Sequence, residues 1–526
     1  MKHIFTISFL LLVFSALARE NKSEMSKPLD ISLKGWNRVL YMNNGTTLLF
    51  HSEPSHMIQV KVFDSARNEK LGREDNYRVL DHFGFNEPVI KGVYEINGEA
   101  VLFIDQQINS RHCLVRLRYD ASNGRLIEEK KIAESRSANK RMEFYVIKHK
   151  DEENYAVLFS TDISYPRSSD IYMVYFDKTH TALKEVQLEV NRKKFDYLKV
   201  LGAEAQPNGI LVSLGLDKTR VWASPHDAPI TEGSGVYDHF VRFFYIPKDS
   251  AKPLTTMINV SETVYPSFGL YTYNSFARTI NYLLYNSHAI AYEFGLDGFH
   301  GVITSTLFLK MDEEKLAGSL RQLKNNLANN HLKSETDTSK YFAGIPAKMV
   351  TNENGLTTII SEAYISHKDQ STASRYDTSY TTLRIGITQT DDDGRELWGT
   401  VLPCGQYYSL MPRESYSYHF NSFRTYSRGK DFFILFNDYD HNFNNSLKEP
   451  GYTINNYENT NAFYYKLNSK KEVTKNYVFG LPAKNEFKCT FIDADYFNEH
   501  TGGYAALIQY KKGETVTVRM AWSRLE

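Results

Sequence analysis

Cysteine is scarce in this chain of 526 residues, which contains only Cys113, Cys404 and Cys489. These three lie far apart, so one disulfide is the most that they allow, and the alternative is that all three are buried free thiols. A disulfide-stapled scaffold is therefore excluded. An apolar core must hold the fold together, and 42% hydrophobic and 14% aromatic residues can supply one.

An excess of charge of one sign is also missing. Lys plus Arg and Asp plus Glu number 62 each, which gives a formal net charge of +0 at pH 7. Such a balance provides no broad attraction for polyanions. We therefore expect no nucleic-acid partner.

Several catalytic signatures are absent as well. The chain has no G-x-S-x-G, no H-E-x-x-H, no G-x-x-x-x-G-K-[ST] and no C-x-x-C. Their absence argues against several familiar hydrolase, metalloprotease, nucleotide-binding and redox mechanisms. It leaves chemistry by paired carboxylates open and favours a binding protein over an enzyme.

Long apolar runs are missing except at the N-terminus. Lys2 and His3 precede an apolar stretch from Ile4 to Phe14, and Ala16 to Ala18 form an A-x-A cleavage site. We predict that residues 1–18 are a signal peptide and that residues 19–35 are a flexible leader. Since no later run reaches the roughly 20 residues that span a bilayer, we expect a soluble mature chain that is secreted or periplasmic.

What the sequence does have is a repeat. A short apolar strand recurs about every 55 residues in the first half of the chain and at intervals above 70 in the second. The eight copies are Thr47 to Phe50, Ala100 to Ile104, Tyr155 to Phe159, Ile210 to Leu214, Tyr282 to Tyr285, Thr357 to Ile360, Phe432 to Phe436 and Tyr504 to Ile508. Each copy opens a unit with a second, alternating strand and often a return strand.

Asp or Asn with a nearby Gly or Lys marks many of the turns between these later strands. Thr390 to Trp398 also approaches the S-x-D-x-G-x-T-W hairpin of sialidase-type propellers, although Glu396 replaces Thr and Trp398 is one place late. Repeated sheets rich in Tyr and Phe favour radial packing around a ring. We predict an all-β fold, a single β-propeller domain over 36–526 with seven or eight blades; the alternative is two stacked β-sandwiches.

One segment has a helical pattern. Leu316, Leu320, Leu323 and Leu327 recur at helical spacing after an acidic start at Asp312. We predict an inserted amphipathic helix near 312–333. It would pack on the side of the ring, or alternatively bind a partner.

Oxygen-bearing side chains alternate after the strand Phe432 to Phe436. This spacing resembles that of a Ca²⁺-binding EF-hand loop. The candidate ligands are Asp438, Asp440, Asn442, Asn444 and Glu449. Phe443 stands where that loop needs Gly, so the alternative is a hairpin loop whose side chains bond their own backbone. Asp493 and Asp495 form a second, weaker acidic cluster.

Aromatic side chains gather in two segments, Tyr265 to Tyr273 and Tyr407 to Tyr418, which we place in inserted connections between blades. Amphipathic rings of this kind can stack on sugars or anchor a peptide. The predicted ligand-binding residues are Tyr271, Tyr273, Tyr407, Tyr408, Arg413 and Tyr416. The alternative is that they plug the ring or cover blade edges.

The chain has a further resemblance. It rests on the signal peptide, on the richness in Asn, Tyr and Phe, and on the segments Trp36 to Leu40 and Phe433 to Asp438. It resembles secreted propeller-like proteins of the Bacteroidota over most of its length. The resemblance implies an exported propeller and brings no catalytic residues with it.

We therefore expect an exported β-propeller that acts as a binding module at the cell envelope, with a protein or a glycan as partner. The alternative is a secreted carbohydrate-active hydrolase with two carboxylates in the axial funnel, since glycoside hydrolysis uses such a pair. Its candidate carboxylates are Glu262, Asp297, Asp438 and Asp493. A third possibility, a structural envelope protein, predicts a funnel filled by the Tyr-rich segments.

Overall fold

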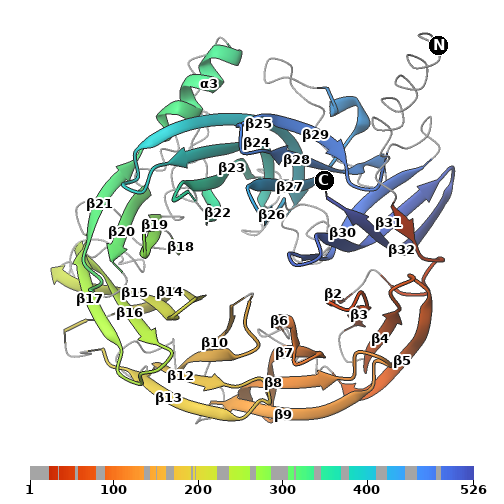
Figure 1. Ribbon diagram of the computed structural model, residues 1–526, viewed down its shortest axis with the longest axis horizontal. Helices are drawn as coiled ribbons and strands as arrows, with labels where there is room; N and C mark the ends of the chain where they lie inside the picture. The colour runs from red at the N-terminus through yellow and green to blue at the C-terminus, as the bar shows by residue number, and fades with distance from the viewer. Residues whose placement is uncertain are drawn as a thin grey trace, which may run out of the picture.

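Eight four-stranded antiparallel sheets stand around one axis in the computed structural model (Figure 1). The prediction of an all-β propeller is confirmed, with eight blades, and the alternative of two stacked sandwiches is wrong. The structure describes residues 23–32, 35–53, 57–78, 89–135, 142–149, 151–161, 171–190, 194–195, 197–221, 236–260, 268–275, 277–285, 306–312, 315–336, 345–352, 354–368, 378–409, 423–444, 459–480 and 487–525.

Each of the first seven blades is a meander in which the first strand borders the axis and the fourth lies outermost (Figure 1). These strands, blade by blade, are β2 (Trp36–Tyr41), β3 (Thr47–Ser52), β4 (Met57–Phe63) and β5 (Glu69–Arg78); β6 (Val89–Ile96), β7 (Glu99–Ile108), β8 (Arg111–Tyr119) and β9 (Leu126–Glu134); β10 (Met142–Lys148), β11 (Tyr155–Thr161), β12 (Ile171–Phe176) and β13 (Ala182–Leu188); β14 (Tyr197–Gln206), β15 (Gly209–Val221), β16 (Val236–Pro247) and β17 (Leu254–Asn259); β18 (Phe268–Asn274), β19 (Thr279–Tyr285), β20 (Thr306–Asp312) and β21 (Gly318–Leu323); β22 (Ile345–Thr351), β23 (Thr357–Lys368), β24 (Thr378–Thr390) and β25 (Glu396–Ser409); and β26 (Arg424–Arg428), β27 (Asp431–Asp438), β28 (Asn461–Leu467) and β29 (Val473–Tyr477). The eighth blade contains β30 (Lys488–Asn498), β31 (Gly503–Lys512) and β32 (Thr515–Arg524).

The eight predicted apolar strands are the second strands of the eight blades. A second strand has a neighbour on both edges and a blade on both faces, so apolar residues occur without alternation. In β3 all six residues are buried, Thr47 included. The core accordingly lies between blades, as where Phe50 of the first blade meets Tyr119 of the second, with ring centroids 5.1 Å apart.

Short turns join first to second strands and third to fourth strands, so these turns share one face of the ring, here called the turn face. Their predicted chemistry is confirmed. The Asp177 carboxylate accepts from the backbone nitrogens of Thr179 and Thr181, both at 2.9 Å. Asp391, in the turn that approaches the sialidase-type hairpin, accepts from Asp393 and Arg395 in the same way.

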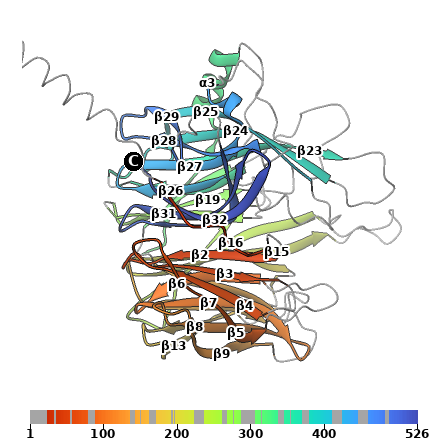
Figure 2. The same cartoon turned by 90° about the vertical axis from the view of Figure 1, so that its right-hand side faces the viewer.

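The opposite face, here called the connection face, carries the links from second to third strands and from blade to blade. Two hairpins extend there: β15 pairs with β16 as far as Val221 and Val236, and β23 pairs with β24 as far as Lys368 and Thr378. Figure 2 shows both hairpins projecting on the same side of the ring. The links 222–235, 286–305 and 410–422 lie outside the described residues.

The ring is closed by the N-terminal end of the described chain. Strand β1 (Glu24–Met25) pairs with β32, so it becomes the outermost strand of the eighth blade. The prediction of a flexible leader over 19–35 is therefore wrong for residues 24–29. The sequence pattern did not predict this strand because the strand is short and mixes polar with apolar residues. An outer strand needs only one buried face and few residues.

A single α-helix is present among the described residues, but it begins later than predicted. Helix α3 (Asn326–Thr336) packs on the outer strand β25 through Ala328 and Leu332, which confirms a helix on the side of the ring. Leu320 and Leu323 instead lie in β21, paired with β20, and Leu316 lies in the preceding turn at φ 50°. Pairing with an existing sheet thus overrides the local helical period.

All three cysteines are buried free thiols. Burial raises the pKa of Cys489 to about 12, which keeps this thiol protonated and unreactive. In the described part of the chain, no helix has the length and hydropathy needed to cross a membrane.

Candidate functional site

Two charged side chains stand exposed on the strands that border the axis. Glu204 lies on β14 of the fourth blade and Lys348 on β22 of the sixth. Within the described residues, neither side chain makes a hydrogen bond or an ion pair. The charge of Lys348 nevertheless acts on the Glu204 carboxyl and lowers its pKa. Because both lie inside strands next to the axis, their exposure means that solvent reaches the axis here. We call Glu204 and Lys348 the axial pair.

Glu204 is exposed, yet it lies inside the ring with protein around it. This partial loss of hydration raises the pKa of the Glu204 carboxyl to about 7, and the Lys348 charge only partly opposes the rise. At neutral pH the carboxyl is therefore present in both its protonated and its ionised form. Such a group can donate or accept a proton without a large energetic cost.

Aromatic hydroxyls surround the same region. On β10 of the neighbouring blade, the Tyr145 hydroxyl donates to Glu143 Oε2 at 3.0 Å, and burial raises the pKa of Tyr145. On β18, Tyr271 is buried, and the charges of Glu204 and Tyr145 act on it. The axial pair, Tyr145 and Glu143 thus come from the innermost strands of three blades.

Other charged groups on innermost strands already have partners. Lys91 Nζ lies 3.1 Å from Asp105 Oδ2 within the second blade. Arg424 forms an ion pair with Asp495, whose second oxygen accepts from Tyr504 at 2.7 Å. The predicted acidic cluster at Asp495 is therefore neutralised by Arg424, which distinguishes it from the axial pair.

The predicted ligand-binding aromatics are not gathered in connections. Tyr271 and Tyr273 lie on β18, and Tyr271 is buried with its ring stacked on Tyr282 at 5.8 Å. Tyr407 and Tyr408 belong to β25, where they pair with β24. The placement of these four in inserted connections is wrong, because regular strands extend further than the apolar pattern indicated. Arg413 and Tyr416 lie outside the described residues.

The predicted Ca²⁺ ligands surround a lysine. Asp438 ends β27, and Asp440 and Asn442 lie in the short 3-10 helix η3 (Asp440–Asn442). Lys475 Nζ lies 3.0 Å from Asp438 Oδ2 and 2.8 Å from the Asn442 carbonyl oxygen. Its ammonium therefore occupies the place that the prediction gave to a cation.

The remaining predicted ligands do not complete a metal site. Asp440 pairs with Lys488 and accepts from Asn461 Nδ2 at 2.7 Å. Asn444 is exposed, and Glu449 is outside the described residues. Among the residues that the structure describes, no cluster of three His, Cys, Asp or Glu could hold a metal ion. Asp438 Oδ1 accepts from the Tyr439 backbone nitrogen at 2.8 Å, as in the alternative of a loop whose side chains bond their own backbone, and it also accepts from Asn442 Nδ2 at 2.7 Å.

The predicted catalytic carboxylates do not converge in the described structure. Asp438 is buried against Lys475, and Asp493 is in β30, where the structure describes only its backbone. Glu262 and Asp297 lie outside the described residues. The innermost strands instead present Glu143 and Glu204.

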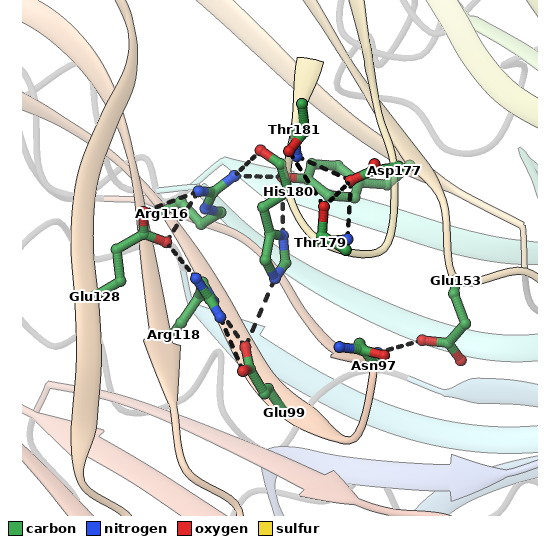
Figure 3. A network of polar contacts seen from close by, with 11 residues as sticks. Asn97, Glu99, Arg116, Arg118, Glu128, Glu153, Asp177, Thr179, His180 and Thr181 are labelled. Atoms are coloured by element: carbon green, nitrogen blue, oxygen red, sulfur yellow. Dashed lines mark hydrogen bonds and ion pairs between the residues drawn. The ribbon is translucent and has the colours of Figure 1, made fainter. Parts of the chain in front are cut away.

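A closed circuit of polar contacts joins the second and third blades on the turn face (Figure 3). Its members are Arg116, Glu128, Arg118, Glu99, His180 and Tyr155. Arg116 donates to the Tyr155 hydroxyl at 2.8 Å, and that hydroxyl lies 3.3 Å from His180 Nδ1. His180 Nε2 faces Glu99 Oε2 at 3.7 Å.

His180 is held neutral in this circuit. Burial, assisted by the Arg116 charge, lowers the pKa of His180 to about 4. Arg116 and Tyr155 are almost fully buried, which leaves no opening for a substrate among them. The circuit therefore fastens two blades together, and the axial pair remains the better candidate for binding.

Comparison with known proteins identifies no family for this chain. No protein-family model and no curated protein matches the sequence. Among solved structures, the chain is similar to polysaccharide lyase Uly1, with 9% identity, a TM-score of 0.42 and coverage of 96% of this chain and 92% of that one.

Two peptidases are also similar in structure. Prolyl oligopeptidase B from Galerina marginata has 10% identity and a TM-score of 0.38, with 95% of this chain covered. A post-proline cleaving enzyme from Rickettsia typhi has 10% identity and a TM-score of 0.35, with 92% covered. This chain spans 56% and 58% of the length of those two proteins.

Sequence reasoning missed the axial pair because it identified the second strand of each blade and left the first strand unassigned. Glu204 stands between Ala203 and Ala205, shortly before the apolar strand that starts at Ile210. A carboxylate between small apolar residues in the segment before a buried strand is the signal that could have found it. Lys348 likewise stands in the segment before a buried strand, the one that starts at Thr357.

Proposed function

We propose that this protein is an exported binding module of the cell envelope and that its connection face holds the partner, a protein or a glycan. The observation that carries the proposal is the asymmetry of the ring. The turn face is made of short turns closed by their own Asp and Asn side chains, such as Asp64 and Asp177. The connection face carries both projecting hairpins, β15–β16 and β23–β24, and binding residues concentrate on such extensions of a rigid scaffold.

Export is supported by the N-terminal sequence and by the position of the closing strand. Cleavage after Ala18 would leave Arg19 as the first residue and keep β1 in the mature protein. Removal of β1 would instead expose the edge of β32. N-terminal sequencing of the protein recovered from the periplasm or medium tests this: a start at Arg19 supports the proposal, and recovery only from the cytoplasm with Met1 contradicts it.

The binding proposal is tested by capture from envelope extract together with a glycan array. One variant replaces 410–422, which contains the predicted Arg413 and Tyr416, with a short Gly-Ser linker. The matched control replaces the turn Asn97-Gly98 on the turn face with Asp-Gly. We expect the first variant to lose the captured partner or glycan and the control to keep it, with both melting as the parent does. Loss of the captured partner or glycan in the control variant alone would contradict the proposal.

A second candidate function is a carbohydrate-active hydrolase, which the raised pKa of Glu204 favours. A carboxyl that is partly protonated at neutral pH can serve as the general acid, and Glu143 on the adjacent β10 offers a second carboxylate. This candidate predicts release of reducing ends from at least one polysaccharide on a broad panel. Glu204→Gln should abolish that release while leaving the melting temperature close to that of the parent.

A further inference from the structure

Five Asn-Gly dipeptides occur in the chain, each at a link between two strands of one blade. An Asn followed by Gly can lose its side-chain amide, because the Gly backbone nitrogen attacks the Asn side-chain carbon and no Cβ atom on the Gly obstructs the attack. The reaction needs a free backbone N–H on the Gly and an Asn side chain that is not held in place. The five dipeptides are Asn44-Gly45, Asn97-Gly98, Asn123-Gly124, Asn208-Gly209 and Asn354-Gly355.

Four of the five are held by hydrogen bonds or by burial. In three of them the Gly backbone nitrogen donates to a carbonyl oxygen three or four residues earlier, at 3.0 Å for Gly45, 2.8 Å for Gly124 and 3.0 Å for Gly355. Gly209 is buried at the start of β15, where a Cβ atom would lie 2.5 Å from the Ile246 carbonyl oxygen. Attack by any of these nitrogens would first have to break a backbone hydrogen bond or displace a packed strand.

Asn97-Gly98 is free of these constraints. The two residues form the exposed tip between β6 and β7, with φ of 52° and 76°. Within the described part of the chain, neither the Gly98 nitrogen nor the Asn97 side chain makes a hydrogen bond, and a Cβ atom on Gly98 would meet nothing within 4 Å. Only the Asn97 backbone nitrogen is held, by the Glu153 carboxylate of the third blade (Figure 3). Opening this tip to bring the Gly98 nitrogen to the Asn97 side chain therefore costs least among the five.

We propose that Asn97 is a site of spontaneous deamidation. The Gly98 nitrogen forms a bond to Asn97 Cγ, and the bond from Cγ to Nδ2 breaks. The Gly98 nitrogen's proton leaves with Nδ2 as ammonia, and a five-membered succinimide remains. Water then adds to one of the two succinimide carbonyl carbons and opens the ring to aspartate or isoaspartate. The product carries a new negative charge beside Glu153 on the turn face, so this site is separate from the connection-face binding proposed above and goes beyond it.

A matched comparison exists at Asn109-Ser110. This pair forms the exposed two-residue tip between β7 and β8, with φ of 49° and 64°, and makes no hydrogen bond through its side chains among the described residues. Ser110 has a Cβ atom beside the attacking nitrogen, so Asn109 should react more slowly than Asn97. Ser110 also shows that such a tip accommodates Ser at its second position, which makes Gly98→Ser a conservative variant.

The test is peptide mapping by mass spectrometry after incubation of the folded protein at mildly alkaline pH, with a parallel incubation in urea. We expect Asn97 to be converted first among the five Asn-Gly sites of the folded protein, and all five to be converted at similar rates in the unfolded chain. Faster conversion of any other Asn-Gly in the folded protein overturns the proposal. The same ranking of the five sites in urea also overturns it, because the order would then not come from the fold.

Variants identify the attacking nitrogen. Gly98→Ser should slow the conversion of Asn97 to the rate of Asn109, and Ser110→Gly should raise the conversion of Asn109 to the rate of Asn97. Circular dichroism checks that both variants keep the fold and the melting temperature of the parent. Unchanged conversion of Asn97 in a folded Gly98→Ser variant overturns the proposal. Capture of the envelope partner, measured separately, reports on the proposed function alone.

Discussion

The backbone nitrogen of Leu29 donates to the carbonyl oxygen of Val518 at 2.8 Å, which joins residues from opposite ends of the chain. The same contact zone includes Ser26, whose nitrogen donates to the Met520 carbonyl at 2.9 Å and whose hydroxyl accepts from the Met520 nitrogen at 3.0 Å. The eighth blade is therefore complete only when the N-terminal strand is in place. Closure of the ring depends on these few residues.

The first prediction concerns this closure. Leu29→Ala removes a side chain that is buried against the last blade, and we expect it to lower the free energy of unfolding by about 2–3 kcal/mol. Chemical denaturation followed by tryptophan fluorescence measures the change. The exposed neighbour Asp30→Ala is the control and should change little. Equal stability of Leu29→Ala and the parent would mean that β1 does not close the ring.

The polar circuit of Figure 3 gives the second prediction. Arg116→Met should lower the free energy of unfolding by about 1–3 kcal/mol, because it leaves the buried Tyr155 hydroxyl without its donor and removes one of the two guanidinium groups that contact Glu128. Lys130→Met on the exposed side of β9 serves as the control. A loss below about 1 kcal/mol, the range of surface pairs, would contradict a fastening role.

The third prediction is a pH dependence from His180. Its pKa is about 4 in the folded protein and near 6.5 in the unfolded chain, so the unfolded chain takes up the proton first as pH falls. Stability from this group is complete above pH 6.5 and is lost as pH falls from 6.5 towards 4. His180→Gln should flatten the stability profile in that window and leave the profile above pH 7 parallel to that of the parent.

The fourth prediction concerns Lys475. Its ammonium already satisfies Asp438 and the Asn442 carbonyl and lies 5.0 Å from the centre of the Phe463 ring. We expect millimolar Ca²⁺ to leave the melting temperature of the parent unchanged and Lys475→Met to destabilise the fold by about 3–5 kcal/mol. A rise in melting temperature with Ca²⁺ that is lost in Asp438→Ala would restore the calcium site.

Sequence reasoning reached eight apolar strands, and from them a ring of seven or eight blades, because a second strand is buried on both faces, so segments such as Phe432 to Phe436 are apolar without interruption. First and fourth strands have one free edge and mixed composition, as in β17, where exposed and half-buried residues alternate. Their positions follow from pairing across the sheet, which no local pattern encodes. The helix predicted near 312–333 begins only at Asn326 for this reason.

The candidate site was harder to predict than the fold. Asp438 and Asp440 have the spacing of a cation loop, but Lys475 and Lys488, which neutralise them, come from distant strands. Glu204 and Lys348 border the same axis only because the ring brings the fourth and sixth blades around it. The candidate site depends on the arrangement of several blades, and the sequence of a single blade does not contain it.

The central claim is that the connection face binds the partner and the turn face does not. Hydroxyl-radical footprinting of the protein with and without its captured partner tests it most directly. The account predicts protection confined to the links 222–235, 286–305 and 410–422 and to the projecting ends of β15, β16, β23 and β24. Protection confined to the turns 120–125, 177–181 and 391–395 would contradict it.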